Sequence, residues 1–343
     1  MEHVDGKVAF ITGGASGIGL GMAKVFARSG LNVAIADIRA DHLEAARELF
    51  GLAGQAGAPG ATDAGVRADS TSAAGRAARG AEPRVHLLRL DVTDRAAYAR
   101  AADEVERVLG PVQVLCNNAG IGITGEMKRA SYDDWDWIID VNLKGVVNGV
   151  QTFVPRMLAH GKGGHIVNTA SMAGLLTYAT AGLYITTKFA VVGLSEALRS
   201  ELARDGIGVS AFCPGGVRTN IREFEKTRPE RYAASGYAGA APVRPPPSRE
   251  AMEALKEFSA DPEDAGEIVL EGIRRNDLYI FTQPEFREGL RERFDAILAT
   301  LGEPDPERAA KLRRIAPFLT GDPIYAAEAR KHSRAVGSEV ERA

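Results

Sequence analysis

The chain has 343 residues, of which 45% are hydrophobic and 25% charged, proportions typical of a globular protein with one large α/β domain or two small ones. A formal net charge of -3 gives no general attraction to nucleic acid or to an anionic membrane, so neither is expected as a partner. No run approaches the roughly 18 continuous apolar residues of a membrane span, and the first residues do not read as a signal peptide, so we expect a cytoplasmic protein.

Seven apolar runs of strand length alternate with stretches of helical periodicity. The runs lie at residues 7–14, 32–38, 84–92, 112–120, 165–171, 208–215 and 278–282. They are apolar at nearly every position, as strands are when both faces of their sheet are covered. We therefore predict a doubly wound (Rossmann) α/β fold, with a seven-stranded parallel sheet, helices on both faces and ligand-binding loops at the carboxyl ends of the strands.

Three further segments have a different composition. Residues 51–83 are dominated by Ala and Gly and are predicted to form a flexible insertion, because they bury too little apolar area to offset the cost of ordering. The Pro- and Gly-rich span 217–258 is predicted to be the substrate loop, either a mobile lid or a disordered surface loop. Amphipathic patterns in residues 284–343 predict a C-terminal helical extension to a single Rossmann-fold domain of residues 1–283.

Cysteine and histidine positions indicate neither a disulfide nor a metal site. Cys116 and Cys213 both lie inside apolar runs, so we expect buried, unpaired thiols. The six histidines show no ligand spacing, and the carboxylates form no evident cluster, so no metal is expected.

A glycine-rich loop follows the first predicted strand and leads into a helical pattern. Its sequence "TGGASGIG" occupies residues 12–19. Glycines let the backbone turn sharply and approach a pyrophosphate, while the helix amino terminus offers free N–H groups. We predict that a dinucleotide contacts this loop through Gly13, Ser16, Gly17, Ile18 and Gly19.

The second predicted strand ends at Asp37. A carboxylate at this position can accept hydrogen bonds from the ribose hydroxyls of the adenosine and would repel a 2'-phosphate, which favours NAD over NADP. The alternative is an Asp that caps the next helix. Arg39, two residues later, keeps NADP open as a second possibility.

The stretch "YITTK" places Tyr184 four residues before Lys188, on the same face of a helix. By itself this pair is more typical of an ordinary solvated helix surface than of a catalytic site. Hydride transfer between an alcohol and a nicotinamide also requires a proton to leave or join oxygen, and a tyrosine performs this step only if nearby positive charge stabilises its phenolate. Ser171, at the carboxyl end of the fifth predicted strand, can hydrogen-bond the substrate oxygen.

Several motifs in a fixed order resemble the short-chain dehydrogenase/reductase family over roughly residues 5–283. They are "TGGASGIG" (12–19), "LDV" with Asp91, "NNAG" (117–120), Asn142 in "DVNLKG", Ser171 in "NTASMAG", "YITTK" and "PGGVRT" (214–219). The resemblance implies an NAD(P)-dependent alcohol dehydrogenase in which Tyr184 is the general base and Asn142, Ser171 and Lys188 complete the catalytic set.

The same resemblance implies further contacts with the cofactor. The residues concerned are Asp91, Val92, Asn118, Ala119, Gly120, Tyr184, Lys188, Pro214, Gly215, Val217 and Thr219. Asn117 is implied to support the central strand beside the cofactor. Alternatively, Asn117 and Asn118 satisfy backbone groups at a strand end.

The extension after "YIFT" and "PEFR" resembles that of aryl Cα-dehydrogenases, which oxidise benzylic alcohols of lignin-derived aryl ethers. The main hypothesis is therefore NAD-dependent oxidation of a secondary, bulky or aromatic alcohol to a ketone. An NADPH-dependent ketone reductase and a non-catalytic dinucleotide sensor remain alternatives. The resemblance also implies a homodimer or homotetramer, with helices at about residues 133–158 and 181–204 at a two-fold interface.

Overall fold

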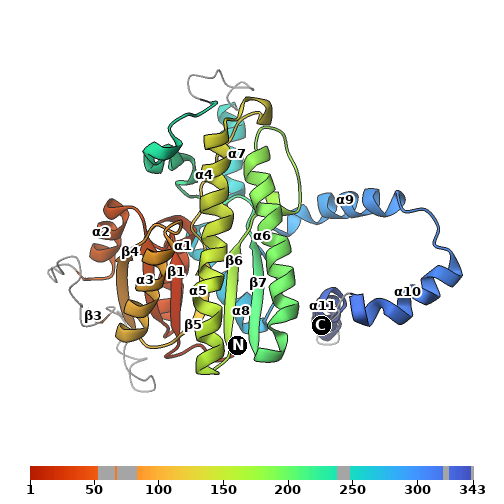
Figure 1. Ribbon diagram of the computed structural model, residues 1–343, viewed down its shortest axis with the longest axis horizontal. Helices are drawn as coiled ribbons and strands as arrows, with labels where there is room; N and C mark the ends of the chain where they lie inside the picture. Colours follow the sequence, from red (N-terminus) through yellow and green to blue (C-terminus); the bar gives the residue numbers. More distant parts are fainter. Residues whose placement is uncertain (53–65, 68–82, 238–247, 320–323, 341–343) are drawn as a thin grey trace.

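The centre of the molecule is a parallel sheet, as predicted (Figure 1). The computed structural model describes residues 1–52, 66–67, 83–237, 248–319 and 324–340. The seven parallel strands are β1 Val8–Thr12, β2 Asn32–Asp37, β4 Arg84–Arg89, β5 Val112–Asn117, β6 Gly164–Thr169, β7 Ile207–Cys213 and β8 Tyr279–Phe281. Their order is β4-β2-β1-β5-β6-β7-β8, so the winding direction reverses between β1 and β5, where α/β proteins bind ligands.

An additional short strand, β3 Val66–Arg67, extends the sheet beyond β4. It pairs antiparallel with β4, Val66 opposite Val85 and Arg67 opposite Arg84. The sequence does not predict β3, because two residues are too few to show a strand period. Most of the predicted flexible insertion of residues 51–83, namely 53–65 and 68–82, lies outside the described residues.

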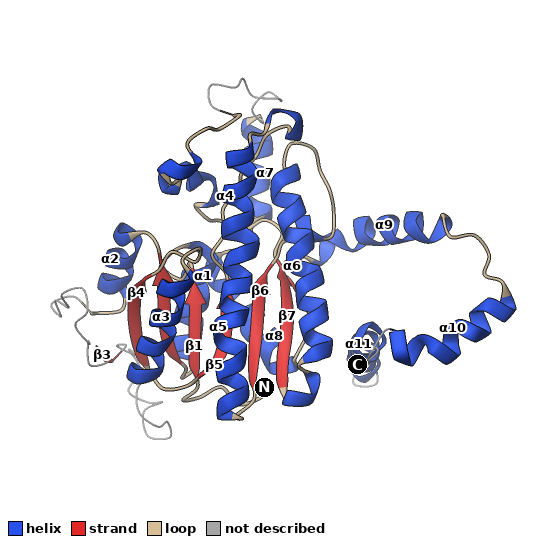
Figure 2. Cartoon of the chain, in the orientation of Figure 1, coloured by secondary structure: helices blue, strands red, loops and turns tan. Residues whose placement is uncertain are grey.

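Helices cover both faces of the sheet (Figure 2). In the described chain they are α1 Gly17–Arg28, α2 Ala40–Leu49, α3 Arg95–Val108, α4 Tyr132–Ile139, α5 Gly145–His160, α6 Gly182–Glu201, α7 Arg249–Phe258, α8 Pro262–Arg275, α9 Arg287–Ala299, α10 Pro306–Leu319 and α11 Ile324–Val340. Ala9 and Ile11 of β1 pack on the side of α1 and α8, whereas Phe10 packs on the side of α3 and α5. This alternation explains why the strand is apolar at every position.

The prediction of two buried, unpaired thiols is confirmed. Cys116 on β5 and Cys213 on β7 are both buried and unpaired, as predicted. None of the helices in the described ranges has the length and apolar character that crossing a membrane requires.

The predicted substrate loop is largely folded where the structure describes it. It contains two 3-10 helices, η6 Ile221–Thr227 and η7 Glu230–Tyr232, followed by α7, while residues 238–247 lie outside the described part. The Ser248 side chain caps α7 by accepting a hydrogen bond from the Ala251 N–H at 3.1 Å. The expectation of a loop throughout 217–258 is therefore wrong for α7, whose cap and helix-forming residues are local signals.

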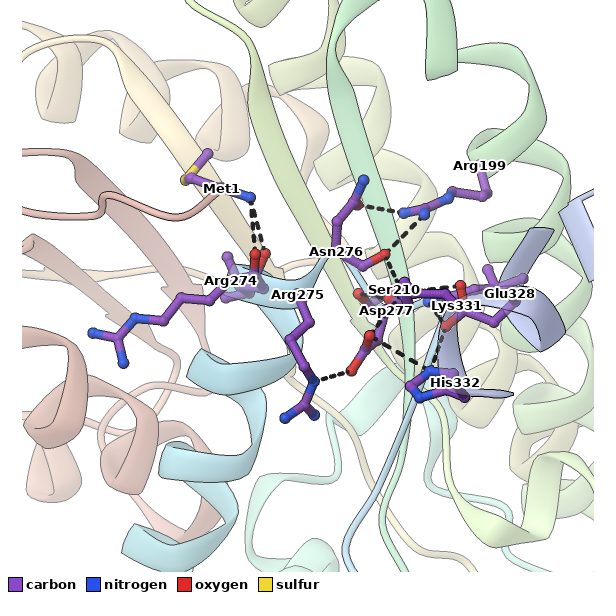
Figure 3. A network of polar contacts seen from close by, with 12 residues as sticks. Met1, Arg199, Ser210, Arg274, Arg275, Asn276, Asp277, Glu328, Lys331 and His332 are labelled. Carbon is purple, nitrogen blue, oxygen red and sulfur yellow. Dashed lines mark hydrogen bonds and ion pairs between the residues drawn. The ribbon is translucent and has the colours of Figure 1, made fainter. Parts of the chain in front are cut away.

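The C-terminal helical extension is confirmed, and its last helix returns to the body of the protein. Helix α9 leads away, α10 turns back, and α11 packs beside α6 (Figure 1). Glu328 of α11 accepts the N–H of Leu278 at 2.8 Å, and Lys331 Nζ lies 2.7 Å from Oδ1 of the buried Asp277 (Figure 3). Asp277, Glu328 and His332 offer metal-ligand atoms within 4.8 Å of one another, but the Lys331 ammonium already pairs with both carboxylates.

Candidate active site

A cavity of about 550 Å³ opens at the carboxyl ends of the strands, on both sides of the switch point between β1 and β5. It collects most of the residues predicted from sequence. Those lining it are Gly13, Ser16, Gly17, Ile18, Asp37, Asp91, Val92, Asn118, Ala119, Gly120, Ser171, Tyr184, Lys188, Pro214, Gly215, Val217 and Thr219. Gly19 and Asn142 are predicted site residues that do not line it.

The glycine-rich turn after β1 is tight and leaves little room for side chains at its glycines. Gly13 and Gly17 have positive φ angles of 59° and 50°, a conformation that favours glycine. A Cβ on Gly19 would lie 2.1 Å from the Gly13 carbonyl oxygen, so Gly19 permits the tight turn without facing the cavity. Ser16 precedes α1 without capping it through its side chain, so the first N–H groups of α1 are available to a ligand.

Asp37 lies at the end of β2 and is only 6% exposed. Its carboxylate accepts the Ala15 N–H at 3.2 Å and the Arg39 N–H at 3.0 Å, which fix its orientation at the cavity wall. Arg39 also lines the cavity, but its guanidinium is paired with Asp41 and lies 3.5 Å from Glu223. The positive charge of Arg39 is therefore largely balanced.

The loops after β4 and β5 complete the side of the cavity nearest β1. Asp91 Oδ1 accepts hydrogen bonds from the N–H and hydroxyl of Thr93 at 2.9 and 2.8 Å. Asn118 donates its side-chain amide to the Thr12 carbonyl at 3.0 Å, which joins the end of β5 to the glycine-rich turn. Asn117 does not line the cavity: its amide contacts Asn168 at 2.9 Å and Tyr98 at 3.3 Å inside the core.

Tyr184 and Lys188 lie side by side in the cavity, with the ammonium 5.4 Å from the centroid of the phenol ring. Lys188 is 3% exposed and donates to the Thr169 carbonyl at 2.8 Å. Burial lowers the pKa of Lys188 to about 8. Burial also raises the pKa of Tyr184 to about 12, and a hydrogen bond with the Ser171 side chain opposes this rise. These three residues therefore form one polar group.

Asn142 lies behind the cavity wall. It is fully buried in a π-helical turn, η3 Asp140–Lys144, between α4 and α5. Its amide donates to the Ile121 carbonyl at 2.9 Å and contacts the Thr187 hydroxyl at 3.2 Å, and its oxygen accepts the Ile121 N–H at 2.8 Å. A Cβ on Gly120 would lie 3.3 Å from the Asn142 oxygen and 3.6 Å from Lys188 Nζ, so the two side chains flank Gly120.

The loop after β7 closes the cavity from the other side. Gly215 donates its N–H to Thr282 and Gln283, both at 3.0 Å, which ties this loop to the end of β8. A Cβ on Gly17 would lie 3.1 Å from the Thr219 methyl group, so Thr219 packs on the glycine-rich turn. The substrate end of the cavity is lined by apolar and aromatic side chains, including Ile121, Trp137, Val141, Tyr178, Ile221, Phe224 and Leu255.

Several polar residues of the cavity were not predicted from sequence. They include His42, Thr93, Thr124, Asn220, Glu223, Thr227 and Arg231. Many of them lie in the loops after β2, β4, β5 and β7. The rule that ligand-binding loops follow the carboxyl ends of strands indicates such loops, but it does not single out these residues.

This combination of a doubly wound sheet, a glycine-rich turn and a Ser-Tyr-Lys group in the cavity is that of a nicotinamide-dependent oxidoreductase. A family model described as short chain dehydrogenase matches residues 7–69 and 54–230, and the chain belongs to this family.

Relatives with similar sequences and structures agree with this assignment. A "C alpha-dehydrogenase" of Sphingobium sp. strain SYK-6 is 41% identical over 313 residues, which cover 90% of this chain and 92% of the relative. The crystal structure of the LigO apo form from the same strain has a TM-score of 0.68 at 38% identity, covering 94% of this chain and 100% of LigO. A short chain dehydrogenase/reductase from Burkholderia phymatum in complex with NAD has a TM-score of 0.71 at 31% identity, covering 89% of this chain and 99% of that one.

Proposed function

We propose that the protein oxidises a secondary, bulky or aromatic alcohol to a ketone with NAD, using Tyr184 as the general base. The observation that carries the proposal is the polar group of Ser171, Tyr184 and the buried Lys188 in a cavity whose other walls include Trp137 and Phe224. The name of the Sphingobium relative, a Cα-dehydrogenase, supports an alcohol substrate of this kind.

The residues present fit a nicotinamide dinucleotide. The uncapped amino terminus of α1 suits a pyrophosphate, and the Asp37 carboxylate suits two ribose hydroxyls. Bound there, the dinucleotide supplies the hydride acceptor for alcohol oxidation. We favour NAD over NADP because the buried Asp37 would repel a 2'-phosphate and because Arg39, the nearby cation, is already paired with Asp41. The relative of known structure that contains NAD is consistent with this choice.

Different side chains carry out different parts of the proposed proton transfer. In the proposed reaction the Ser171 hydroxyl orients the alcohol oxygen, and Tyr184 removes its proton as the hydride leaves carbon. Burial opposes this role, because even with the Ser171 hydrogen bond the pKa of Tyr184 is raised to about 12. The Lys188 ammonium, 5.4 Å from the ring and protonated at pH 7 because its pKa is about 8, favours the phenolate. We propose that Asn142 holds the turn at Gly120 and Ile121 and so supports Lys188 from behind.

The test is a panel of benzylic and aliphatic secondary alcohols, with NADH formation as the readout. Alcohol oxidation with NAD, with a kcat/KM clearly higher than that measured with NADP, would support the proposal. Tyr184→Phe should reduce kcat by about a thousandfold or more while the Kd for NAD stays within about twofold. Reduction of ketones with NADPH, with no NAD-linked oxidation, would favour the reductase. Cofactor binding without turnover of any substrate would favour a sensor.

We also propose a homodimer. Tyr325 of α11 hydrogen-bonds Glu196 of α6 at 2.9 Å, and Glu328 accepts the N–H of Leu278 at the start of β8. These contacts hold α11 beside α6 and the start of β8, an edge strand of the sheet, which would otherwise be available to another subunit. The face formed by α5 and α6 then remains for a two-fold contact.

A further inference from the structure

The aromatic wall of the cavity is held by a buried ion pair that lies outside the reacting group. We call residues 219–237, which follow β7 and include η6 and η7, the wall segment. Its cavity-lining members are Thr219, Asn220, Ile221, Glu223, Phe224, Thr227, Pro229 and Arg231. On its other side the wall segment packs against α4, which contributes Trp137 to the same cavity.

Asp134 of α4 is the central acceptor of this contact. Its side chain is fully buried, and Oδ2 accepts the Gly236 N–H at 2.9 Å and the Ser131 N–H at 3.0 Å. Oδ1 accepts Nη2 of Arg228 at 2.9 Å. Burial alone would raise the pKa of Asp134, but hydrogen bonds from Ser131, Gly236 and Arg228 outweigh it and lower this pKa below its usual value. The Asp134 carboxylate is therefore ionised, and both of its oxygens accept hydrogen bonds from groups of the protein itself.

Arg228 connects Asp134 to the aromatic side chains that line the cavity. Its guanidinium lies 4.3 Å from the centroid of the Trp137 ring, and the Trp137 and Phe224 rings are 6.0 Å apart. Arg228 also donates to the Tyr232 carbonyl at 3.0 Å, within η7. Because the Arg228 side chain is only 9% exposed, these contacts are poorly screened by solvent.

A second contact fastens the wall segment to the turn that carries Asn142. The hydroxyl of the buried Tyr232 donates to Oδ2 of Asp140, the first residue of η3. Asp140 is in turn paired with Lys144. The wall segment is therefore attached at both ends of α4, one turn before Trp137 and one turn after it.

We propose that Asp134 is a specificity-determining positioning residue: through Arg228 it holds Trp137 and Phe224 at the cavity and so selects bulky, aryl-bearing alcohols. The proposal rests on the proposed function. It assigns no contact with the reacting atoms to Asp134, and it predicts that loss of the pair changes which alcohol is accepted more than it changes the chemical step.

The first experiment compares Asp134→Asn with the exposed control Asp136→Asn on the same helix. For a bulky benzylic alcohol, Asp134→Asn should raise KM about tenfold with kcat within about threefold, whereas for a small secondary alcohol such as 2-butanol kcat/KM should change less than about twofold. The Kd for NAD and all values for Asp136→Asn should stay within about twofold of wild type. An equal loss for both alcohols, or an unchanged ratio, overturns the proposal.

Two further variants keep the test valid if Asp134→Asn folds poorly. Arg228→Met should cause the same change in selectivity, and the double variant should be no worse than either single one because the two residues act as a pair. The double variant leaves neither partner as an unpaired buried charge. Additive losses in the double variant would overturn the proposal.

A fluorescence experiment separates this inference from the proposed function. The chain has two tryptophans, so a Trp135→Phe background leaves Trp137 as the reporter. Removing Arg228 or Asp134 should increase acrylamide quenching of Trp137 by about twofold or more, because the indole is 2% exposed in the intact wall. If the wild type oxidises no alcohol, the proposed function fails, but unchanged quenching is what would show that the pair does not hold the wall.

Discussion

Replacing Lys188 with Met is expected to stabilise the fold while it removes activity. Burial lowers the pKa of Lys188 from its ordinary value of 10.5 to about 8. Since one pKa unit corresponds to about 1.4 kcal/mol, keeping the ammonium charged at pH 7 costs the folded state about 3 kcal/mol. The variant also loses the 2.8 Å hydrogen bond to the Thr169 carbonyl, which contributes about 1 kcal/mol. The free energy of unfolding should therefore rise by about 2 kcal/mol at pH 7.

The pH dependence gives this prediction a distinctive sign. Because the folded pKa of Lys188 lies below the unfolded one, the unfolded chain binds more protons between about pH 8 and 10.5. The free energy of unfolding of the wild type should therefore rise with pH in this window, while that of Lys188→Met should not. The extra stability of the variant should be greatest below about pH 8 and absent by about pH 10.5.

Urea unfolding followed by circular dichroism, at pH 7 and near the top of this window, measures the difference directly. The exposed Lys162→Met change is the control and should alter stability by less than about 0.5 kcal/mol at either pH. The reasoning is refuted if Lys188→Met is less stable than wild type at pH 7, or if the difference between them is the same at both pH values.

Three other predictions concern the cofactor, the base and the assembly. Asp37→Ala should lower the ratio of kcat/KM with NAD to kcat/KM with NADP by roughly ten- to a hundredfold, and Asp37→Arg should make NADP the preferred cofactor. If this ratio is unchanged in both variants, the charge argument is contradicted. If Tyr184 acts as the base, kcat/KM for alcohol oxidation should increase with pH as the phenol deprotonates, and kcat/KM for ketone reduction should fall over the same range, whereas equal pH profiles would exclude the assignment. Light scattering should give a dimer for the full chain and a tetramer or aggregates after truncation at Gln283; a full-length tetramer would contradict the proposed role of α11.

Local patterns were sufficient for the sheet and for the glycine-rich turn. The strands are buried on both faces, so continuous apolar runs such as Val8–Thr12 predict them directly. The spacing places Tyr184 and Lys188 on one face of a helix, but only the accompanying family motifs distinguish them from an ordinary surface pair. Gly13 and Gly17 can be predicted because their positive φ angles favour glycine. In each case the physical requirement acts within a few residues of the chain.

The roles of other residues depend on which loops the fold brings together. Asn142 and Asn117 both occur in recognisable motifs, yet the first lies behind Gly120 and the second joins Asn168 in the core. Their sequence positions do not reveal this, because the direction of an amide side chain depends on the acceptors that neighbouring strands and helices supply.

The sequence by itself therefore determined the class of fold, the glycine-rich turn, the carboxylate at the end of the second strand and the spacing of the Tyr-Lys pair. Only the tertiary structure decided the shape of the substrate end and the attachment of the C-terminal helix. The ion pair of Arg228 with Asp134 joins residues 94 positions apart, and the hydrogen bond of Glu328 with Leu278 joins residues 50 positions apart. Such contacts leave no periodic signal in the chain, because they form only after the parallel sheet has gathered the ends of its strands and helices in space.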